Sequence, residues 1–240
     1  MISFLVACFN EEKNIINTIT EIENSCEELK IDDFEIIIID DCSKDKSKEL
    51  VNKFKINKSY LRLITNNKNL GYGGSIKKGA NFAKKEYIIW VPGDNAHKKE
   101  ELIKILKEVG KYDIISTYYT NANKRNKFRQ MFTDFYTPIL NFLFNLKLPY
   151  YNGVTLIRRS IFLELSIFTN SHNFSVEMWV KIKLKKNLNI TFVPTLLDER
   201  LRGANAFKLL NSIKVLFNTL RMIIYFYLVK FLKLFKFKIR

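Results

Sequence analysis

Residues 34–43 have the sequence FEIIIIDDCS, in which four consecutive isoleucines are followed by two aspartates. An unbroken β-branched run predicts a strand buried on both faces, as in the parallel sheet of an α/β protein. The carboxylates of Asp40 and Asp41 would then lie at the carboxyl end of this strand. There they need a hydrogen-bond donor, a cation or a ligand hydroxyl, unless they form a solvated turn that caps the next helix.

Similar apolar runs occur on both sides of this stretch, separated by segments with helical spacing. We expect further strands at 2–8, 60–64, 87–91 and 113–117, and helices at 11–29, 46–54, 73–84 and 99–108. Alternating strands and helices predict a parallel sheet of right-handed βαβ units. Ligands of such sheets bind at the carboxyl ends of the strands, so we expect the chemistry just after them.

The composition indicates one packed domain with an appendage. The chain has 240 residues, of which 47% are hydrophobic and 27% charged, and only 8 Gly and 4 Pro, which excludes a collagen-like or linker-dominated protein. Cys8, Cys26 and Cys42 form no C-x-x-C pair, so we expect neither disulfides nor a zinc site, and a reduced cytosolic compartment. The apolar start, residues 2–7, lacks the basic region of a signal peptide and is interpreted as a strand.

The positive charge is concentrated at the C-terminus. The chain has 40 Lys and Arg against 24 Asp and Glu, a formal charge of +16. Residues 200–240 contain ten of the basic residues and no acid, so the first 199 residues carry only +6. This shift places a boundary near residue 205. The excess charge predicts a polyanionic partner, which is a nucleic acid, an anionic membrane or a phosphorylated substrate.

The tail from residue 207 is both apolar and basic. Its central charge-free stretch, 222–229, has eight residues, far fewer than the ~20 that span a bilayer. The polar residues change phase near Lys230, which predicts a bend or break between 225 and 230, or two short helices. A cationic face opposite aromatic and aliphatic residues is typical of an interfacial membrane helix. The alternative is a helix packed on its own domain or on a partner subunit.

Two further motifs follow expected strands. Residues 69–75, NLGYGGS, match neither a Walker A loop nor G-x-G-x-x-G, and they form either a plain turn or a loop whose backbone approaches a ligand. In residues 92–97, PGDNAH, Asp94 either belongs to a turn or holds a divalent cation that clamps a pyrophosphate. His97 and His172 show no metal-ligand spacing and no hydrolase triad.

Taken in order, FNEEKNI (9–15), DDCSKDKS (40–47), NLGYGGS (69–75) and GDNAH (93–97) resemble family 2 glycosyltransferases with the GT-A fold. The segments look most like those of dolichyl- or polyprenyl-phosphate sugar transferases. The resemblance covers residues 1–205 and is closest up to His97. It implies an α/β GT-A domain over 1–205, with a mostly parallel central sheet flanked by helices, followed by a basic amphipathic helical tail over 206–240.

The resemblance implies a nucleotide-diphosphate sugar as donor. The donor-binding residues that it implies are Phe9, Asn10, Glu11, Asp40, Asp41, Gly71, Gly73 and Asp94. Asp94 would occupy the second acidic position of the family's Asp-x-Asp metal motif, but Pro92 occupies the first. A Mg²⁺ or Mn²⁺ site at Asp94 is therefore expected to be weak or absent.

Further matches imply catalytic and acceptor residues. Asp94, Glu177 and Arg202 are the candidate catalytic residues, and Arg125, Arg129, Arg200 and Arg202 the candidate ligands of an acceptor phosphate. Arg125 and Arg129 lie one helical turn apart, which fits either one bound anion or an exposed basic face. Glu177 fits a buried hydrogen-bond acceptor as well as it fits a catalytic group.

The function implied is that of an inverting, hexosyltransferase-like enzyme, peripheral at the cytoplasmic face of the membrane, in cell envelope glycan biosynthesis. Its acceptor would be a polyprenyl phosphate, whose oxygen attacks the anomeric carbon while the nucleotide diphosphate leaves. One alternative is transfer to a hydroxyl of a surface glycan, with Glu177 or Asp94 as the base. Another is a catalytically weak or inactive GT-A binding protein. No nucleic-acid-binding motif is present, so we expect no nucleic-acid partner.

Overall fold

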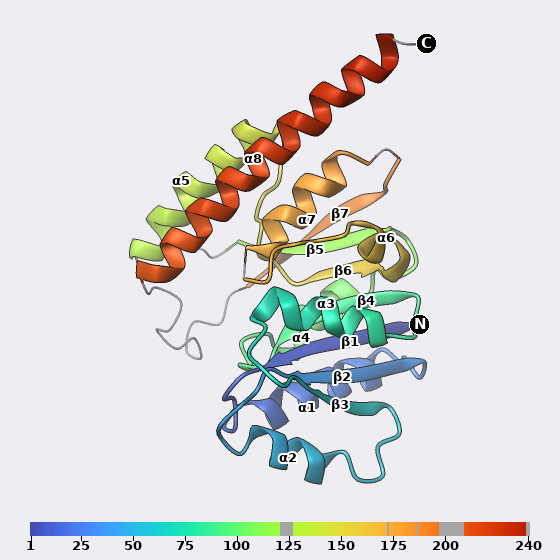
Figure 1. Cartoon of the computed structure of the whole chain (residues 1–240). Coiled ribbons are helices and arrows are strands. Elements are labelled where there is room, and N and C mark those ends of the chain that lie inside the picture. The colour runs from blue at the N-terminus through green and yellow to red at the C-terminus, as the bar shows by residue number, and fades with distance from the viewer. Residues whose placement is uncertain (121–126, 172, 186, 197–208, 239–240) are drawn as a thin grey trace.

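The computed structural model describes residues 1–120, 127–171, 173–185, 187–196 and 209–238 (Figure 1). Its centre is a seven-stranded sheet in the order β3-β2-β1-β4-β6-β5-β7. The strands are β1 (Ile2–Cys8), β2 (Phe34–Asp40), β3 (Leu61–Thr65), β4 (Tyr87–Pro92), β5 (Ile114–Tyr119), β6 (Thr155–Arg158) and β7 (Ile190–Thr195). The helices of the first half are α1 (Ile15–Glu28), α2 (Ser47–Phe54), α3 (Tyr72–Phe82) and α4 (Lys99–Leu106). The strands and helices expected up to residue 119 are therefore confirmed, with ends shifted by a few residues.

The first four strands run parallel, and their carboxyl ends are in register. Cys8 pairs with Asp40, Ala7 with Pro92, and Asp40 with Thr65. The residues that follow β1, β2, β3 and β4 therefore meet at one edge of the sheet, as the sequence predicts.

The second half of the sheet departs from simple alternation. β6 lies between β4 and β5 and is antiparallel to both, whereas β5 and β7 are parallel. The sheet is thus mostly parallel, as expected. Gly153, just before β6, permits the close approach to β5, because a Cβ atom there would lie 1.9 Å from the carbonyl oxygen of Thr117.

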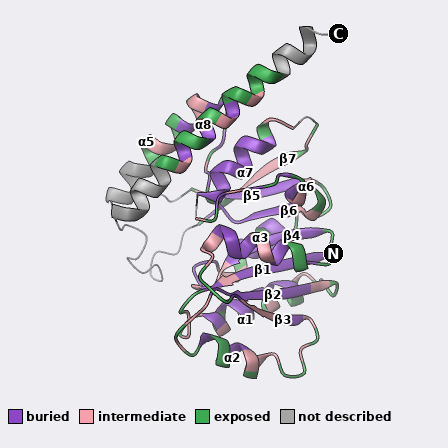
Figure 2. Cartoon of the chain, in the orientation of Figure 1, coloured by how far each residue is buried: buried purple, intermediate pink, exposed green. Residues whose placement is uncertain are grey.

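Helices cover both faces of the sheet and enclose two cores. The isoleucine run of β2 contributes to both, because Ile36 and Ile38 join the core under α1, α2 and α4, whereas Ile37 and Ile39 join the core on the opposite face. Side chains of successive strand residues alternate between faces, so a run of four buried isoleucines requires helices on both sides. Figure 2 shows the buried strands between these two layers.

The second core also contains four later helices, α5 (Lys127–Phe144), α6 (Arg159–Glu164), α7 (Phe174–Lys183) and α8 (Leu209–Lys238). α5 and α8 lie side by side and run in the same direction (Figure 1). The side-chain oxygens of Tyr136 and Thr219 are 3.4 Å apart, and the rings of Phe144 and Phe226 are 5.5 Å apart.

α8 is one uninterrupted helix, so the expected break or pair of short helices between 225 and 230 is wrong. Helical hydrogen bonding continues through the change of phase because no Pro or Gly interrupts residues 209–238. Within the residues described, no helix combines the length and apolarity that crossing a membrane requires. The boundary expected near residue 205 lies outside the described residues.

Candidate functional site

The loops after β1 and β2 are tied to each other at the carboxyl edge of the sheet. The backbone N–H of Asn10 donates to Ser43 Oγ at 3.0 Å, and the Lys44 N–H donates to Asn10 Oδ1 at 2.8 Å. The Glu11 N–H donates to Ser47 Oγ at 2.8 Å. Residues 10–14 are thereby kept out of α1, which begins at Ile15 rather than at residue 11.

Asp41 holds the glycine loop of residues 69–75. Its side chain accepts hydrogen bonds from the backbone N–H groups of Leu70 at 2.7 Å and Gly71 at 2.8 Å, and from Asn66 Nδ2 at 2.8 Å. Asp41 is only 4% exposed, and these protein donors satisfy both carboxylate oxygens. A buried carboxylate with this many donors fixes the loop that it binds.

Asp40 makes fewer contacts than Asp41. It is 1% exposed, and the hydrogen bond described for its side chain comes from the Ser43 N–H at 3.3 Å. Of the two aspartates, Asp40 therefore keeps acceptor capacity for a donor group placed at the end of β2. Cys42, the next residue, has a φ of 67° and turns the chain sharply away from this edge.

The end of β4 is fixed against β1 and α1. The Gly93 N–H donates to the Ala7 carbonyl at 3.0 Å, and the Thr18 hydroxyl donates to the Gly93 carbonyl at 3.1 Å. Asp94, which follows, lies close enough to Glu11 to affect its ionisation. Burial, and then repulsion by Asp94 and Asp45, raise the pKa of Glu11, which a hydrogen bond from Asn14 opposes.

His97 points into a buried polar cluster. Its Nδ1 is 2.8 Å from Glu101 Oε2, and the two side chains are 4% and 6% exposed. Glu101 Oε1 also accepts from Thr117 Oγ1 at 3.1 Å and from Thr195 Oγ1 at 3.4 Å. The pair thus links the loop after β4 to the ends of β5 and β7.

The residues around Asp94 do not form a metal site of their own. Asp94 Oδ1 accepts from the Ala96 N–H at 3.1 Å, and nowhere in the described ranges do three His, Cys, Asp or Glu side chains gather around a common point. Asn95 adds one buried side-chain oxygen without a described hydrogen-bond partner. Asp94 and the Asn95 amide would supply at most two positions of an octahedral Mg²⁺ shell, so a cation here would depend on water and on donor phosphate oxygens for the others.

Glu177 supports the loop that packs against the glycine loop. It is fully buried, and its two carboxylate oxygens accept from the N–H groups of Phe168 and Thr169, each at 2.8 Å. Lys181 Nζ pairs with the same carboxylate at 2.7 Å. The segment 166–171 then reaches Gly71, which has a φ of +78° and where a Cβ atom would lie 2.8 Å from the Asn170 carbonyl oxygen.

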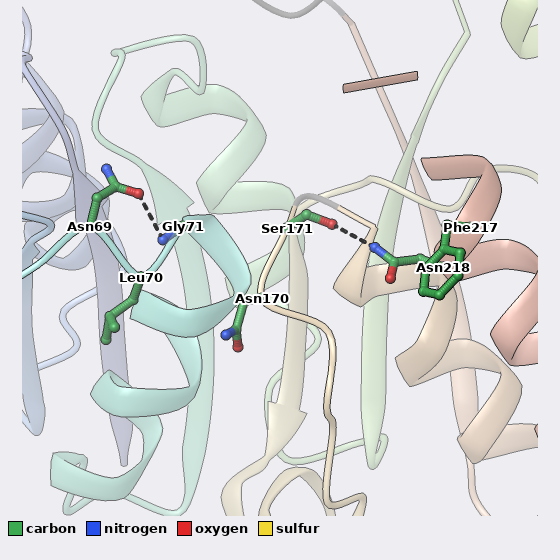
Figure 3. A pocket seen from close by; sticks show the side chains of 7 residues that line it. All are labelled: Asn69, Leu70, Gly71, Asn170, Ser171, Phe217 and Asn218. Carbon is green, nitrogen blue, oxygen red and sulfur yellow. Dashed lines mark hydrogen bonds between the residues drawn. The ribbon is translucent and has the colours of Figure 1, made fainter. Parts of the chain in front are cut away.

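A pocket of about 580 Å³ lies between the glycine loop, segment 166–171 and α8 (Figure 3). Its lining residues are Asn69, Leu70, Gly71, Asn170, Ser171, Phe217 and Asn218. Asn218 Nδ2 donates to Ser171 Oγ at 3.4 Å across it. The pocket is therefore lined by Phe217 and Asn218 of the tail together with the loop that Asp41 holds, and Asn218 is hydrogen-bonded to segment 166–171.

The structure thus gathers the predicted donor-binding residues at the carboxyl ends of β1, β2, β3 and β4, with Phe9 46% exposed at their rim. Arg125, Arg200 and Arg202 lie outside the described residues. Arg129 lies in α5, but its side chain is not among those described. The sequence analysis missed Asn66, although its position as a polar residue directly after β3 could have indicated it. It also missed the pocket residues of α8, which no local pattern indicates.

The mostly parallel sheet with helices on both faces is an α/β fold of the GT-A type. The model of the family "Glycosyl transferase family 2" matches residues 3–166. The chain therefore belongs to glycosyl transferase family 2.

Among curated relatives, an uncharacterized protein of Methanocaldococcus jannaschii is 32% identical over 144 residues, covering 58% of this chain and 60% of the relative. A dolichyl-phosphate beta-glucosyltransferase of Trichomonas vaginalis is 30% identical over 45% of this chain and 33% of the relative. The matches thus span 60% or less of these relatives.

Solved structures confirm the fold. Glucosyl-3-phosphoglycerate synthase from Mycobacterium tuberculosis, in complex with Mn²⁺, uridine-diphosphate and phosphoglyceric acid, superposes with a TM-score of 0.66 at 16% identity, covering 93% of this chain and 78% of that one. S. aureus TarS in complex with UDP-GlcNAc gives 0.55 at 17% identity, covering 86% and 61%.

Proposed function

We propose that the chain transfers a sugar from a nucleotide-diphosphate donor to a polyprenyl phosphate at the cytoplasmic face of a membrane. The observation that carries the proposal is the pocket that the glycine loop shares with α8, because it joins the donor edge to the amphipathic tail. Similarity to a dolichyl-phosphate beta-glucosyltransferase and to an undecaprenyl-phosphate 4-deoxy-4-formamido-L-arabinose transferase of Pseudomonas fluorescens, 26% identical over 50% of this chain and 36% of that relative, supports this acceptor class.

Different residues at the carboxyl edge of the sheet would bind different parts of the donor. Asp40 and Glu11 would accept hydrogen bonds from the base and ribose, and Phe9 would form the exposed rim beside them. Asp41 acts through the glycine loop, whose residues Gly71 and Gly73 would approach the donor with their backbone. Asp94 would lie at the diphosphate end of the donor, where its carboxylate would hold a weakly bound divalent cation against the diphosphate oxygens.

The reaction would be a displacement at the anomeric carbon. An oxygen of the acceptor phosphate forms the new bond while the bond to the donor's diphosphate breaks, and the nucleoside diphosphate leaves with the electron pair. The phosphate acceptor is already anionic, so no strong general base is needed, and stabilisation of the leaving group dominates the catalysis. Arg125, Arg129, Arg200 and Arg202 are the proposed source of that positive charge, with Arg202 as a catalytic group.

Glu177 takes a different part in this proposal from Asp94. Because backbone N–H groups and Lys181 occupy its carboxylate, we assign it to positioning segment 166–171 beside the donor edge. Asp94 remains the proposed catalytic carboxylate. With Pro92 in place of a second acid, we propose weak or absent dependence on divalent cations.

Transfer to a glycan hydroxyl is the second candidate. Similarity to a poly-beta-1,6-N-acetyl-D-glucosamine synthase of Staphylococcus epidermidis, 27% identical over 52% of this chain and 29% of the relative, favours it. A hydroxyl acceptor requires a general base, and Asp94 would supply it.

The test is incubation of the full chain with labelled nucleotide sugars and a polyprenyl phosphate, followed by extraction into an organic phase. We expect label in the lipid, little loss on adding a chelator, and at least tenfold less label with Asp94→Asn. Lys48→Gln, on exposed α2, is the control. Label transferred to a glycan primer but not to lipid would favour the second candidate, and absence of both products would contradict the proposal.

A further inference from the structure

The described part of α8 carries a stripe of exposed apolar side chains. Its exposed large apolar side chains are Phe217, Leu220, Ile224, Tyr227, Leu228, Phe231 and Leu232. Steps of three and four residues place these side chains on one face of the helix. The opposite face, with Thr219, Met222 and Phe226, is buried.

α5 has a matching stripe. Phe135, Ile139 and Phe142 are 66%, 52% and 86% exposed, and they follow one another at steps of four and three residues. Leu140 and Phe144, on the other side of this helix, are fully buried.

The two stripes face the same way. The buried residues of both helices, including Leu140, Phe144, Met222 and Phe226, belong to the same core, so the stripes point away from it. The helices also touch along their flanks, where the Tyr227 hydroxyl donates to the Leu143 carbonyl at 2.9 Å. Figure 2 shows exposed residues along both helices at the outer side of the molecule. We call this two-helix surface the α5/α8 face.

The charge of α8 indicates what covers this face. Its sequence has six basic residues, Lys214, Arg221, Lys230, Lys233, Lys236 and Lys238, and no acid. Among these, Arg221 and Lys230 lie in the described part of the surface and are exposed. A surface with exposed aromatic and aliphatic groups beside exposed cations complements an anionic lipid headgroup layer, whereas a protein partner would have to supply a matching acidic rim.

We propose that the α5/α8 face is a composite membrane-binding surface, which lies in the headgroup region of an anionic bilayer with the side chains of both helices inserted. This surface would bring the enzyme to a lipid acceptor, and that part of the inference rests on the proposed function. Phe217 belongs both to the stripe and to the pocket beside the glycine loop. A lipid held at this face would therefore lie next to the pocket that the glycine loop lines.

Vesicle binding by the full chain tests this surface without measuring transfer. We expect binding that increases with the fraction of anionic lipid and weakens at high salt, because surface charges are screened over about 10 Å at 0.1 M salt. Two variants separate the helices: Phe135→Ser/Phe142→Ser changes α5 alone, and Ile224→Ser/Leu228→Ser changes α8 alone. Each should weaken binding to phosphatidylglycerol-containing vesicles at least fivefold, whereas Ile56→Ser, equally exposed at 66% but beside α2, should not.

A charge variant provides a second arm of the test. Lys230→Glu/Lys233→Glu should remove the preference for anionic over neutral vesicles, and Lys44→Glu/Lys48→Glu, on the α2 side, should leave it intact. Wild-type binding by the α5 variant would overturn the composite surface. If the wild-type chain forms a dimer without lipid, the apolar variants are monomers, and the chain does not bind vesicles, the face would instead be an interface with a second copy of the chain.

Transfer assays keep the two proposals distinguishable. The apolar variants should retain transfer to a short, water-soluble polyprenyl phosphate while losing transfer to the same acceptor in vesicles. If the wild-type chain binds vesicles but transfers no sugar to either acceptor, the proposed function fails and the membrane surface stands. If every apolar variant transfers sugar to the soluble acceptor and to the vesicle-bound acceptor as well as the wild-type chain does, the membrane-surface proposal fails and the proposed function stands.

Discussion

Two adjacent carboxylates at the end of β2 have different roles, and their neighbours decide which. Asp41 receives two backbone N–H groups of the glycine loop and the Asn66 amide, whereas Asp40 receives one longer bond from Ser43. A sequence shows only that both need partners. The partners of Asp41 come from 25 to 30 residues further along the chain.

We expect Asp41→Asn to destabilise the free protein by about 1.5–3 kcal/mol, because an amide cannot accept from all three donors of this buried site. Urea unfolding measures this. Asp40→Asn is the matched variant, and it should leave stability nearly unchanged while weakening nucleotide-sugar binding in calorimetry. Equal stability of the two variants would show that the glycine loop does not depend on Asp41.

Glu11 predicts a pH dependence of stability. Its folded-state pKa is raised, chiefly by burial, so the charged form is disfavoured in the folded state. Glu11→Gln should therefore raise stability at neutral pH. The gain should fade as pH falls through the raised pKa of Glu11 toward the ordinary value of 4.5, and it should be absent below that value. Thermal melts at pH 7 and pH 4 check this. Glu49→Gln, on exposed α2, should give no comparable gain at neutral pH, and a gain for Glu11→Gln that grows on acidification would contradict the assignment.

At the scale of elements, the sequence predicts what depends on strand and helix periodicity, and little that depends on pairing between distant segments. The parallel edge follows from apolar runs such as 36–39, because consecutive βαβ units place their carboxyl ends together. The insertion of β6 depends on the missing side chain of Gly153, next to Thr117. The sequence of α5 does not show which of its apolar residues stay exposed, because this depends on where α8 packs against it.

The loop before α7 depends on one buried ion pair. Glu177→Ala should cost about 3 kcal/mol or more, because it leaves the Lys181 ammonium, 7% exposed, without its carboxylate partner. The double variant Glu177→Ala/Lys181→Met should be more stable than the sum of the single changes predicts. Denaturant unfolding of the four proteins measures the coupling, and additive effects would show that the pair does not act as a unit.

At the scale of the whole molecule, the C-terminal helix is part of the core as well as of the surface. Met222 and Phe226 are 1% and 3% exposed and join the core that includes Trp179. The middle of the tail, with Met222 and Phe226, is therefore packed on the domain. This corresponds to the alternative in which the helix packs on its own domain, and the outer stripe remains available to a membrane.

Phe226→Ala should cost about 3–5 kcal/mol, as large-to-small changes in a packed core do. Leu228→Ala, two residues away and 53% exposed, should change stability by no more than about 0.5 kcal/mol. Thermal unfolding of the full chain compares the two. Similar small effects would mean that α8 is not integrated into the core.

The place of β6 in the sheet has a consequence for the order in which the chain can be assembled during synthesis. Residues 1–92 contain β1, β2, β3 and β4, which can pair among themselves, but the outer edge of β4 stays open until β6, ending at Arg158, has emerged. An open edge containing Ile88 and Ile89 is a template for pairing with another chain. Ribosome-bound chains stalled with residues 1–120 exposed should therefore aggregate or be cleaved by protease more readily than chains exposing residues 1–170. Equal protection of the two lengths would show that β4 is covered before β6 arrives.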